Sequence, residues 1–126
     1  MTISSDQTCF ILVHGSWHAA WCWDKVGTEL NAGRFRHLAI DLPGHGEHAL
    51  IPDSYAALPL SQNQFTTELS KLAHLTASDY AAAVADAAHA ARLAGARRVI
   101  GVGHSMGGVP LTFAAGTHPH LFDGLI

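Results

Sequence analysis

One stretch of the sequence joins a buried strand to a tight turn: Arg98-Val99-Ile100-Gly101-Val102-Gly103-His104-Ser105-Met106-Gly107. Its apolar start predicts a strand buried on both faces of a sheet. The pattern Gly-x-Ser-x-Gly at its end is typical of a turn that passes directly from strand to helix and lifts the serine above the sheet. Side chains two residues either side of that serine would clash, which explains the two glycines. We therefore predict that Ser105 is a nucleophile over a helix N-terminus. Pro110 predicts a kink or a short irregular turn early in that helix.

Three further apolar runs predict strands. Residues 9–13 and 37–40 are rich in strand-forming residues and are followed by turn signals, and another strand begins at 122–126. Residues 20–30, between the first two runs, can form a helix. Strands that alternate with helices predict an α/β fold with a doubly wound, mostly parallel sheet and helices on both faces.

The clearest helix signal lies at 76–95. Thr76-Ala77-Ser78-Asp79 resembles a capping box, and Gly95 is a stop signal. Five residues share one face of this helix: Tyr80, Val84, Ala87, Ala88 and Ala91. The small residues among them would let the helix approach the sheet closely. Residues 50–75, by contrast, contain two prolines and have no clear hydrophobic period. They predict a loop or short-helix excursion over one end of the sheet.

Distinctive residues follow three of the predicted strands: His14-Gly15-Ser16, then Asp41-Leu42-Pro43-Gly44-His45-Gly46, then residues 103–107. In doubly wound sheets, ligands bind at the carboxyl ends of the strands. We therefore expect these three loops to meet at one site. An acyl-transfer site needs two N–H donors for the oxyanion, and the natural candidates are the backbone N–H groups of Met106 and Ser16.

Other side chains near these loops have two interpretations each. His14 and His18 could contact a substrate or hold the loop by hydrogen bonds, and Gly15 would let the backbone approach the reacting carbonyl. His104 could face the substrate, but neighbours on a tight turn point apart, which favours a turn role. The aromatic side chains at 17, 21 and 23 could form a pocket wall with Trp17 at the substrate, although core packing of at least two of the three is favoured. Asp41 is better placed to cap its turn than to orient a catalytic base.

The same residues resemble the α/β-hydrolase family. Val13-His14-Gly15, the loop at 41–46 and the glycine-rich turn at 103–108 are similar to its third strand, the loop after its fourth strand and its nucleophile elbow. The stretch at 14–23 resembles the branch that contains plant-type methylesterases, hydroxynitrile lyases and bacterial esterase-like relatives. The resemblance covers nearly the whole chain except residues 50–75, which look like an insertion or cap-like excursion. It implies the spatial strand order 36–41, 8–13, 98–102, then 122 onward.

The resemblance also indicates where the catalytic acid and the catalytic histidine should lie. It places the catalytic acid and histidine on later loops, and the chain has only 21 residues after Ser105. We expect both residues beyond Ile126, so that residues 1–126 are the N-terminal part of a single α/β-hydrolase domain, truncated after the nucleophile helix. The isolated chain should then be nearly inactive and prone to aggregate. A split subunit completed by another polypeptide is an alternative.

The expected function is a serine hydrolase of the carboxylesterase or lactonase type, which cleaves a small apolar ester through an acyl-serine. One alternative is a lyase on the same scaffold that cleaves a cyanohydrin-like C–C bond. Lyases of this branch typically have threonine at the position of Gly15, which favours the esterase. Another alternative is a non-catalytic protein that binds a small ligand in the same pocket.

Composition excludes other classes of protein. The 126 residues are 48% hydrophobic and 13% charged, which indicates a folded core rather than a disordered segment. A net charge of -3 without a basic cluster argues against nucleic acid as a partner. No long apolar run or signal-like start is present, so we expect a cytoplasmic protein without a membrane span. The histidines and the two cysteines lack metal-ligand spacing, so neither a metal nor another cofactor is implied, and the oligomeric state stays open.

Overall fold

A computed structural model describes residues 2–126. Four strands form one sheet in the order β2-β1-β3-β4: β1 (Thr8–Val13), β2 (Arg36–Ile40), β3 (Arg98–Gly103) and β4 (Gly124–Leu125). All neighbouring strands are parallel. The strand order implied by the family resemblance is therefore confirmed, and so is the α/β class. β1 lies in the interior of the sheet and is buried along nearly its whole length, as its unbroken apolar run predicts.

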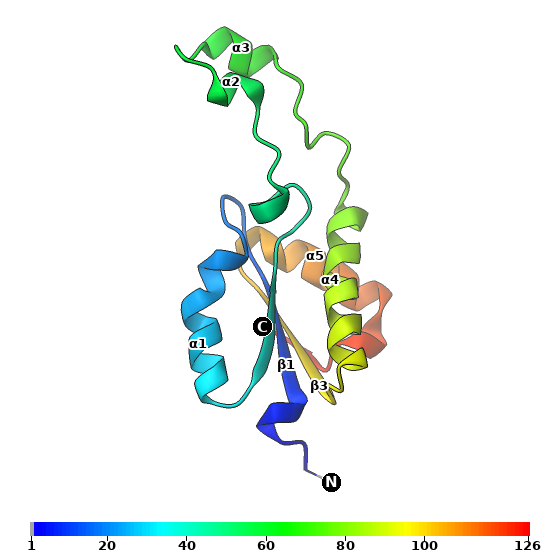
Figure 1. Ribbon diagram of the computed structural model, residues 1–126. Coiled ribbons are helices and arrows are strands. Elements are labelled where there is room, and N and C mark those ends of the chain that lie inside the picture. Colours follow the sequence, from blue (N-terminus) through cyan, green and yellow to red (C-terminus); the bar gives the residue numbers. More distant parts are fainter. Residues whose placement is uncertain (1) are drawn as a thin grey trace.

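Helices cover both faces of the sheet (Figure 1). α1 (Asp24–Ala32) lies on one face, and α4 (Ala77–Leu93) and α5 (Gly108–Thr117) lie on the other. The predicted helix at 20–30 is split, because a 3-10 turn at Ala20–Trp23 comes before α1. A 3-10 turn at Ser105–Gly107 likewise precedes α5, with Pro110 buried in the first turn of that helix. The irregular turn thus lies before the helix and not at Pro110 itself, because a proline in the first turn of a helix removes no intrahelical hydrogen bond.

α4 begins and ends where the sequence predicts. The Thr76 hydroxyl accepts a hydrogen bond from the Asp79 N–H at 3.3 Å, and the Asp79 carboxylate accepts one from the Thr76 N–H at 2.7 Å. After the helix, Gly95 adopts φ +92°, a left-handed conformation that favours glycine. The buried side chains are Ala81, Val84, Ala85, Ala88 and Ala91, while Tyr80 and Ala87 from the predicted face lie partly buried at its edge. The helix thus presents small side chains to the sheet, rotated slightly from the expected face.

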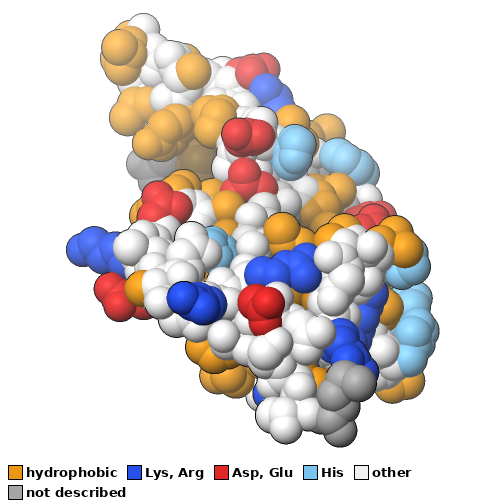
Figure 2. All heavy atoms as spheres, turned by 60° about the horizontal axis from the view of Figure 1, so that its bottom comes forward, with side chains coloured by type: hydrophobic (Ala, Val, Ile, Leu, Met, Phe, Trp, Pro, Cys, Tyr) orange, Lys and Arg blue, Asp and Glu red, His pale blue; other side chains and the backbone are white. Residues whose placement is uncertain are grey.

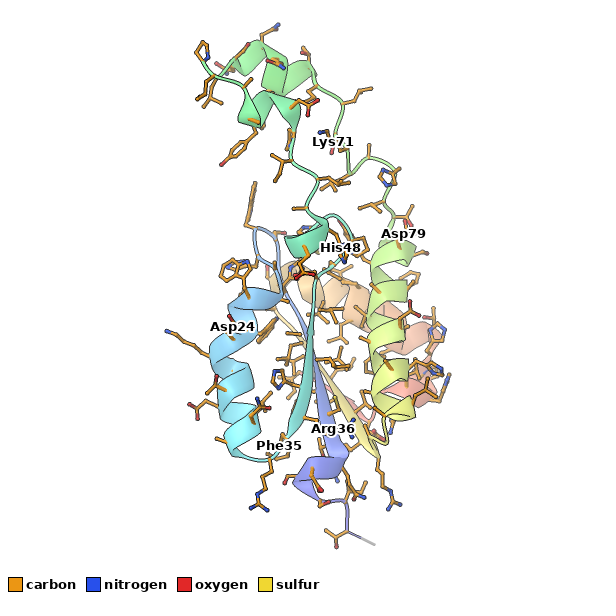
Figure 3. All side chains as sticks on the ribbon, viewed as in Figure 1. Asp24, Phe35, Arg36, His48, Lys71 and Asp79 are labelled. Carbon is orange, nitrogen blue, oxygen red and sulfur yellow. The ribbon has the colours of Figure 1, made fainter. Side chains whose placement is uncertain are left out.

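The segment 50–75 contains two short helices, α2 (Asp53–Ala56) and α3 (Gln62–Thr67), and stands away from the carboxyl end of the sheet (Figure 1). We call it the excursion. The Glu68 carboxylate accepts hydrogen bonds from the N–H groups of Asp53 at 2.7 Å and Ser54 at 3.0 Å. Lys71 forms an ion pair with Asp53 at 2.7 Å. Figure 3 shows Lys71 on the excursion and Asp79 at the end of α4 that follows it.

Several large apolar side chains of the excursion face solvent. They gather at the top of the view in Figure 2, and they are Leu50, Ile51, Tyr55, Leu58, Leu60, Phe65 and Leu69. Among residues 2–126, no helix has the length and apolar character needed to cross a membrane.

Candidate active site

Ser105 occupies the strained turn that the sequence predicts. It follows β3 and opens the 3-10 turn before α5, and its φ is 54°, in the left-handed region. A side chain in that region costs about 1–2 kcal/mol, so the surrounding structure must enforce it. The residue is exposed at the carboxyl end of the sheet. The backbone therefore presents the serine hydroxyl to solvent directly above a helix N-terminus.

The two glycines of the motif are required by close backbone packing. A Cβ atom on Gly103 would lie 2.8 Å from the Cα atom of Gly108. A Cβ atom on Gly107 would lie 2.4 Å from the carbonyl oxygen of His14 and 2.5 Å from that of Val13. Real Cβ atoms do not approach other atoms this closely, so no larger residue fits at either position without movement of the main chain.

The loop after β1 lies against the serine turn. The His104 N–H donates a hydrogen bond to the Val13 carbonyl at 3.0 Å. A Cβ atom on Gly15 would lie 2.9 Å from the His104 carbonyl oxygen and 3.0 Å from the Ser105 Cβ atom. Two of the three loops that were expected to meet are thus in direct contact, and Gly15 is the point of closest approach to Ser105.

Neither predicted oxyanion donor is used for a hydrogen bond within residues 2–126. Ser16 is exposed, and its N–H group has no acceptor in this part of the chain. The same holds for the N–H group of Met106, the residue after the serine. Both amides are therefore free to bind an acceptor on a ligand.

His14 is fully buried, with 0% exposure, and holds two loops together. Its Nδ1 lies 2.8 Å from the Gly15 carbonyl oxygen, and its Nε2 accepts a hydrogen bond from the Leu42 N–H at 3.1 Å. Burial lowers the pKa of the imidazole below its ordinary value, which keeps the ring neutral. Of its two sequence interpretations, the structure shows the loop contact, and neither ring nitrogen is left for a substrate.

His18 and His104 lie side by side at the mouth of the site. Their ring centroids are 5.8 Å apart in an edge-to-face arrangement, and the His18 Nδ1 lies 2.8 Å from the Ser16 carbonyl oxygen. Both rings line a hollow of about 260 Å³ with Cys22, Trp23 and Val26. A substrate-facing role for these two histidines is thus compatible with their positions.

The expected core packing of at least two tryptophans is wrong. Trp17 is 95% exposed, because it lies in the turn after β1 with φ 67°, and Trp21 is 61% exposed beside the His18 ring. Trp23 is partly buried and lines the hollow next to His104. The alternative, a pocket wall, fits Trp23.

Asp41 caps its turn, as favoured from the sequence. Its carboxylate accepts hydrogen bonds from the N–H groups of Ala20 at 2.7 Å and Glu47 at 3.1 Å. Partial burial acts to raise the pKa of this carboxyl, but the two hydrogen bonds outweigh it and the pKa lies below its ordinary value. The residue thereby ties the loop after β2 to the start of the 3-10 turn that precedes α1.

Sequence reasoning missed the wall of the hollow beside the nucleophile. This hollow, of about 600 Å³, is lined by Ser105, Gly108, Val109, Thr112 and Phe113. These positions follow the period of one helix face, since they lie three, four, seven and eight residues after the serine. The periodicity of the residues after the motif could therefore have grouped them on one face with Ser105.

Comparisons with known proteins agree with this geometry. Residues 10–126 match the model of the Alpha/beta hydrolase family. Esterase PIR7B of Oryza sativa subsp. japonica is 34% identical over 116 residues, which are 92% of this chain and 36% of that protein. Methylesterase 1 of Arabidopsis thaliana is 34% identical over 110 residues, which are 87% of this chain and 34% of that protein.

A solved structure of the methylesterase MES16 from Arabidopsis superposes with a TM-score of 0.67 at 27% identity, covering 94% of this chain and 41% of that one. The chain thus spans little more than a third of the length of the curated relatives that it matches. The match over residues 10–126, the four-stranded parallel sheet and the serine turn agree with one another. The chain belongs to the alpha/beta hydrolase family, where its relatives include plant methylesterases and other esterases.

Proposed function

We propose that the protein is a serine esterase in which Ser105 forms an acyl-enzyme with a small, largely apolar ester or lactone. One observation carries the proposal: Ser105 has a left-handed φ of 54° directly after β3 and lies against Gly15, and the next residue after each of these two has a backbone amide without an acceptor among residues 2–126. A strained backbone conformation of this kind persists only where the surrounding structure enforces it. Such conformations are common at catalytic nucleophiles.

The reaction has two chemical steps. The Ser105 oxygen attacks the ester carbonyl, a base removes its proton, and the N–H groups of Met106 and Ser16 bind the oxyanion. The alcohol leaves with that proton, and water then hydrolyses the acyl-serine by the same route. The family resemblance places the base and its orienting acid on later loops, and the chain spans little more than a third of the length of its curated relatives, so we assign both residues to the remainder of the complete protein.

The substrate class rests on the hollow beside the serine. Val109 and Phe113 supply apolar surface there, which suits an apolar acyl or alcohol group. The names of the relatives, esterases and methylesterases, support an ester as the substrate.

The lyase alternative is disfavoured by the contact at Gly15. A Cβ atom there would lie 2.9 Å from the His104 carbonyl oxygen, so the threonine that lyases of the branch typically carry would require movement of the main chain. Cyanide release without ester turnover would favour the lyase instead.

The experiment compares the complete gene product with its Ser105→Ala variant in hydrolysis of p-nitrophenyl acetate. Removal of a serine nucleophile typically lowers kcat by about 10⁴- to 10⁶-fold. We expect a loss of this size with an unchanged melting temperature, because Ser105 is exposed. Undiminished turnover in the variant would contradict the proposal.

A further inference from the structure

The peptide group between Gly15 and Ser16 is anchored on its carbonyl side. The Gly15 carbonyl oxygen lies 2.8 Å from the His14 Nδ1 and accepts a second hydrogen bond from the His18 N–H at 3.3 Å. In a trans peptide, the C=O and N–H bonds of one group point in opposite directions. Two donors on the carbonyl therefore fix the direction of the Ser16 N–H on the other side.

We propose that His14 is a positioning residue that aims the Ser16 N–H at the reacting oxygen. The inference rests on the proposed function, in which that N–H is one of two oxyanion donors. Preorganised donors stabilise the transition state because they need not reorient as charge develops. His14 acts through the Gly15 carbonyl and does not touch the substrate, since its side chain is fully buried.

The direction of both His14 hydrogen bonds follows from the Leu42 contact. The Leu42 N–H can only donate, so the Nε2 atom at 3.1 Å must be the acceptor and carry no proton. A neutral imidazole has one proton, which therefore lies on Nδ1 and points to the Gly15 carbonyl at 2.8 Å. Leu42 belongs to the loop after β2. Its N–H group therefore selects the tautomer of His14, and this tautomer orients the peptide group between Gly15 and Ser16.

The surroundings keep this ring neutral. His14 is buried, and the His45 ring lies 5.1 Å away between centroids. His45 and His18 oppose a positive charge on His14, whereas Asp41 favours one. Protonation would place a hydrogen on Nε2 against the Leu42 N–H and break that contact. The relay from Leu42 to Ser16 thus depends on a neutral His14.

Two substitutions separate the two halves of the relay. In His14→Asn, the side-chain amide can occupy the place of Nδ1 and donate to the Gly15 carbonyl, but it is too short to reach Leu42. In His14→Gln, the amide can reach the place of Nε2 and accept from Leu42, but it leaves the Gly15 carbonyl without this donor. Each variant keeps one of the two hydrogen bonds, so they are matched controls for stability.

The test is hydrolysis of p-nitrophenyl acetate by the complete gene product, with melting temperatures measured in parallel. Loss of a whole oxyanion donor costs about 100- to 1000-fold in kcat, so a misaimed donor should cost about tenfold to 100-fold. We expect that loss in His14→Gln with little change in KM, and a kcat within about threefold of wild type in His14→Asn. Equal kcat losses that follow the two melting temperatures would overturn the inference, because they would indicate a structural role alone.

Two further measurements keep the inference testable. If Ser105→Ala keeps full activity, the proposed function fails; if it is inactive while His14→Gln equals wild type, only the positioning role fails. If neither His14 variant folds, nitrogen NMR of wild-type histidines decides. We expect a neutral His14 with its proton on Nδ1, and a proton on Nε2 would overturn the inference.

Discussion

The loops after β1 and β3 and the excursion lie at the same end of the sheet, yet they are held in different ways. In the strand-end loops, main chain packs on main chain: a Cβ atom on Gly107 would lie 2.4 Å from the His14 carbonyl oxygen. The excursion depends on contacts of side chains, with the Glu68 carboxylate on the start of α2 and Lys71 paired with Asp53. Close backbone packing permits only glycine, so it can be recognised in the sequence. Surface contacts can be made by many different residues and leave no such pattern.

The largest effect should come from a methyl group at the closest backbone contact. In Gly107→Ala, the added Cβ meets the carbonyl oxygens of Val13, the last residue of the interior strand β1, and of His14 directly after it, so relief requires movement of the main chain. We expect a loss of about 3 kcal/mol or more in the free energy of unfolding of the complete gene product. Chemical denaturation measures it.

Gly116→Ala is the control for this prediction. A Cβ atom there meets nothing within 4 Å, and the residue lies in α5. Alanine in place of glycine within a helix should stabilise the protein by about 0.5–1 kcal/mol. Equal changes in the free energy of unfolding for Gly107→Ala and Gly116→Ala would contradict the argument that close backbone packing requires glycine at position 107.

A moderate effect should appear on acidification. Burial lowers the pKa of His14 in the folded state, so the unfolded state binds more protons once the pH falls below about 6.5. Titration of His14 therefore leaves the free energy of unfolding unchanged above this pH and lowers it below this pH. We expect the free energy of unfolding to fall more steeply from pH 7 to pH 5 in wild type than in His14→Asn, which cannot titrate. Identical slopes would show that His14 is not held neutral by the fold.

The smallest effect should come from the excursion. Glu68→Gln weakens the acceptor for the N–H groups of Asp53 and Ser54, which belong to the excursion and not to the hydrophobic core cluster. We expect faster amide exchange at these two residues and an unchanged melting temperature. Glu29→Gln on α1 removes the same charge elsewhere and should leave both amides unchanged. A global loss of stability in Glu68→Gln would mean that the excursion is part of the core.

This contrast also explains how far the sequence could be interpreted. The strand at 98–103, the glycines around Ser105 and the capping box at Thr76 were predictable because each depends on a local backbone requirement. The exposure of Trp17 and Trp21 was not, since large aromatic side chains usually pack and only the turn geometry directs these outward. The role of His14 was also open from the sequence, because its hydrogen-bond partner Leu42 lies 28 residues away along the chain.

The hollow lined by Val109, Thr112 and Phe113 is an intermediate case. Its residues follow helical periodicity from Ser105, but that periodicity indicates a shared face and not which face borders the site. Only the placement of α5 against β3 decides this.

The most direct test of the central claim is covalent labelling of the complete gene product with a fluorophosphonate, followed by peptide mass spectrometry. An activated serine displaces fluoride and keeps the phosphonyl group, whereas an ordinary exposed serine such as Ser16 does not react. We expect a single adduct on Ser105, which is lost when the protein is unfolded before labelling. An unmodified Ser105, or equal labelling of Ser16, would contradict it.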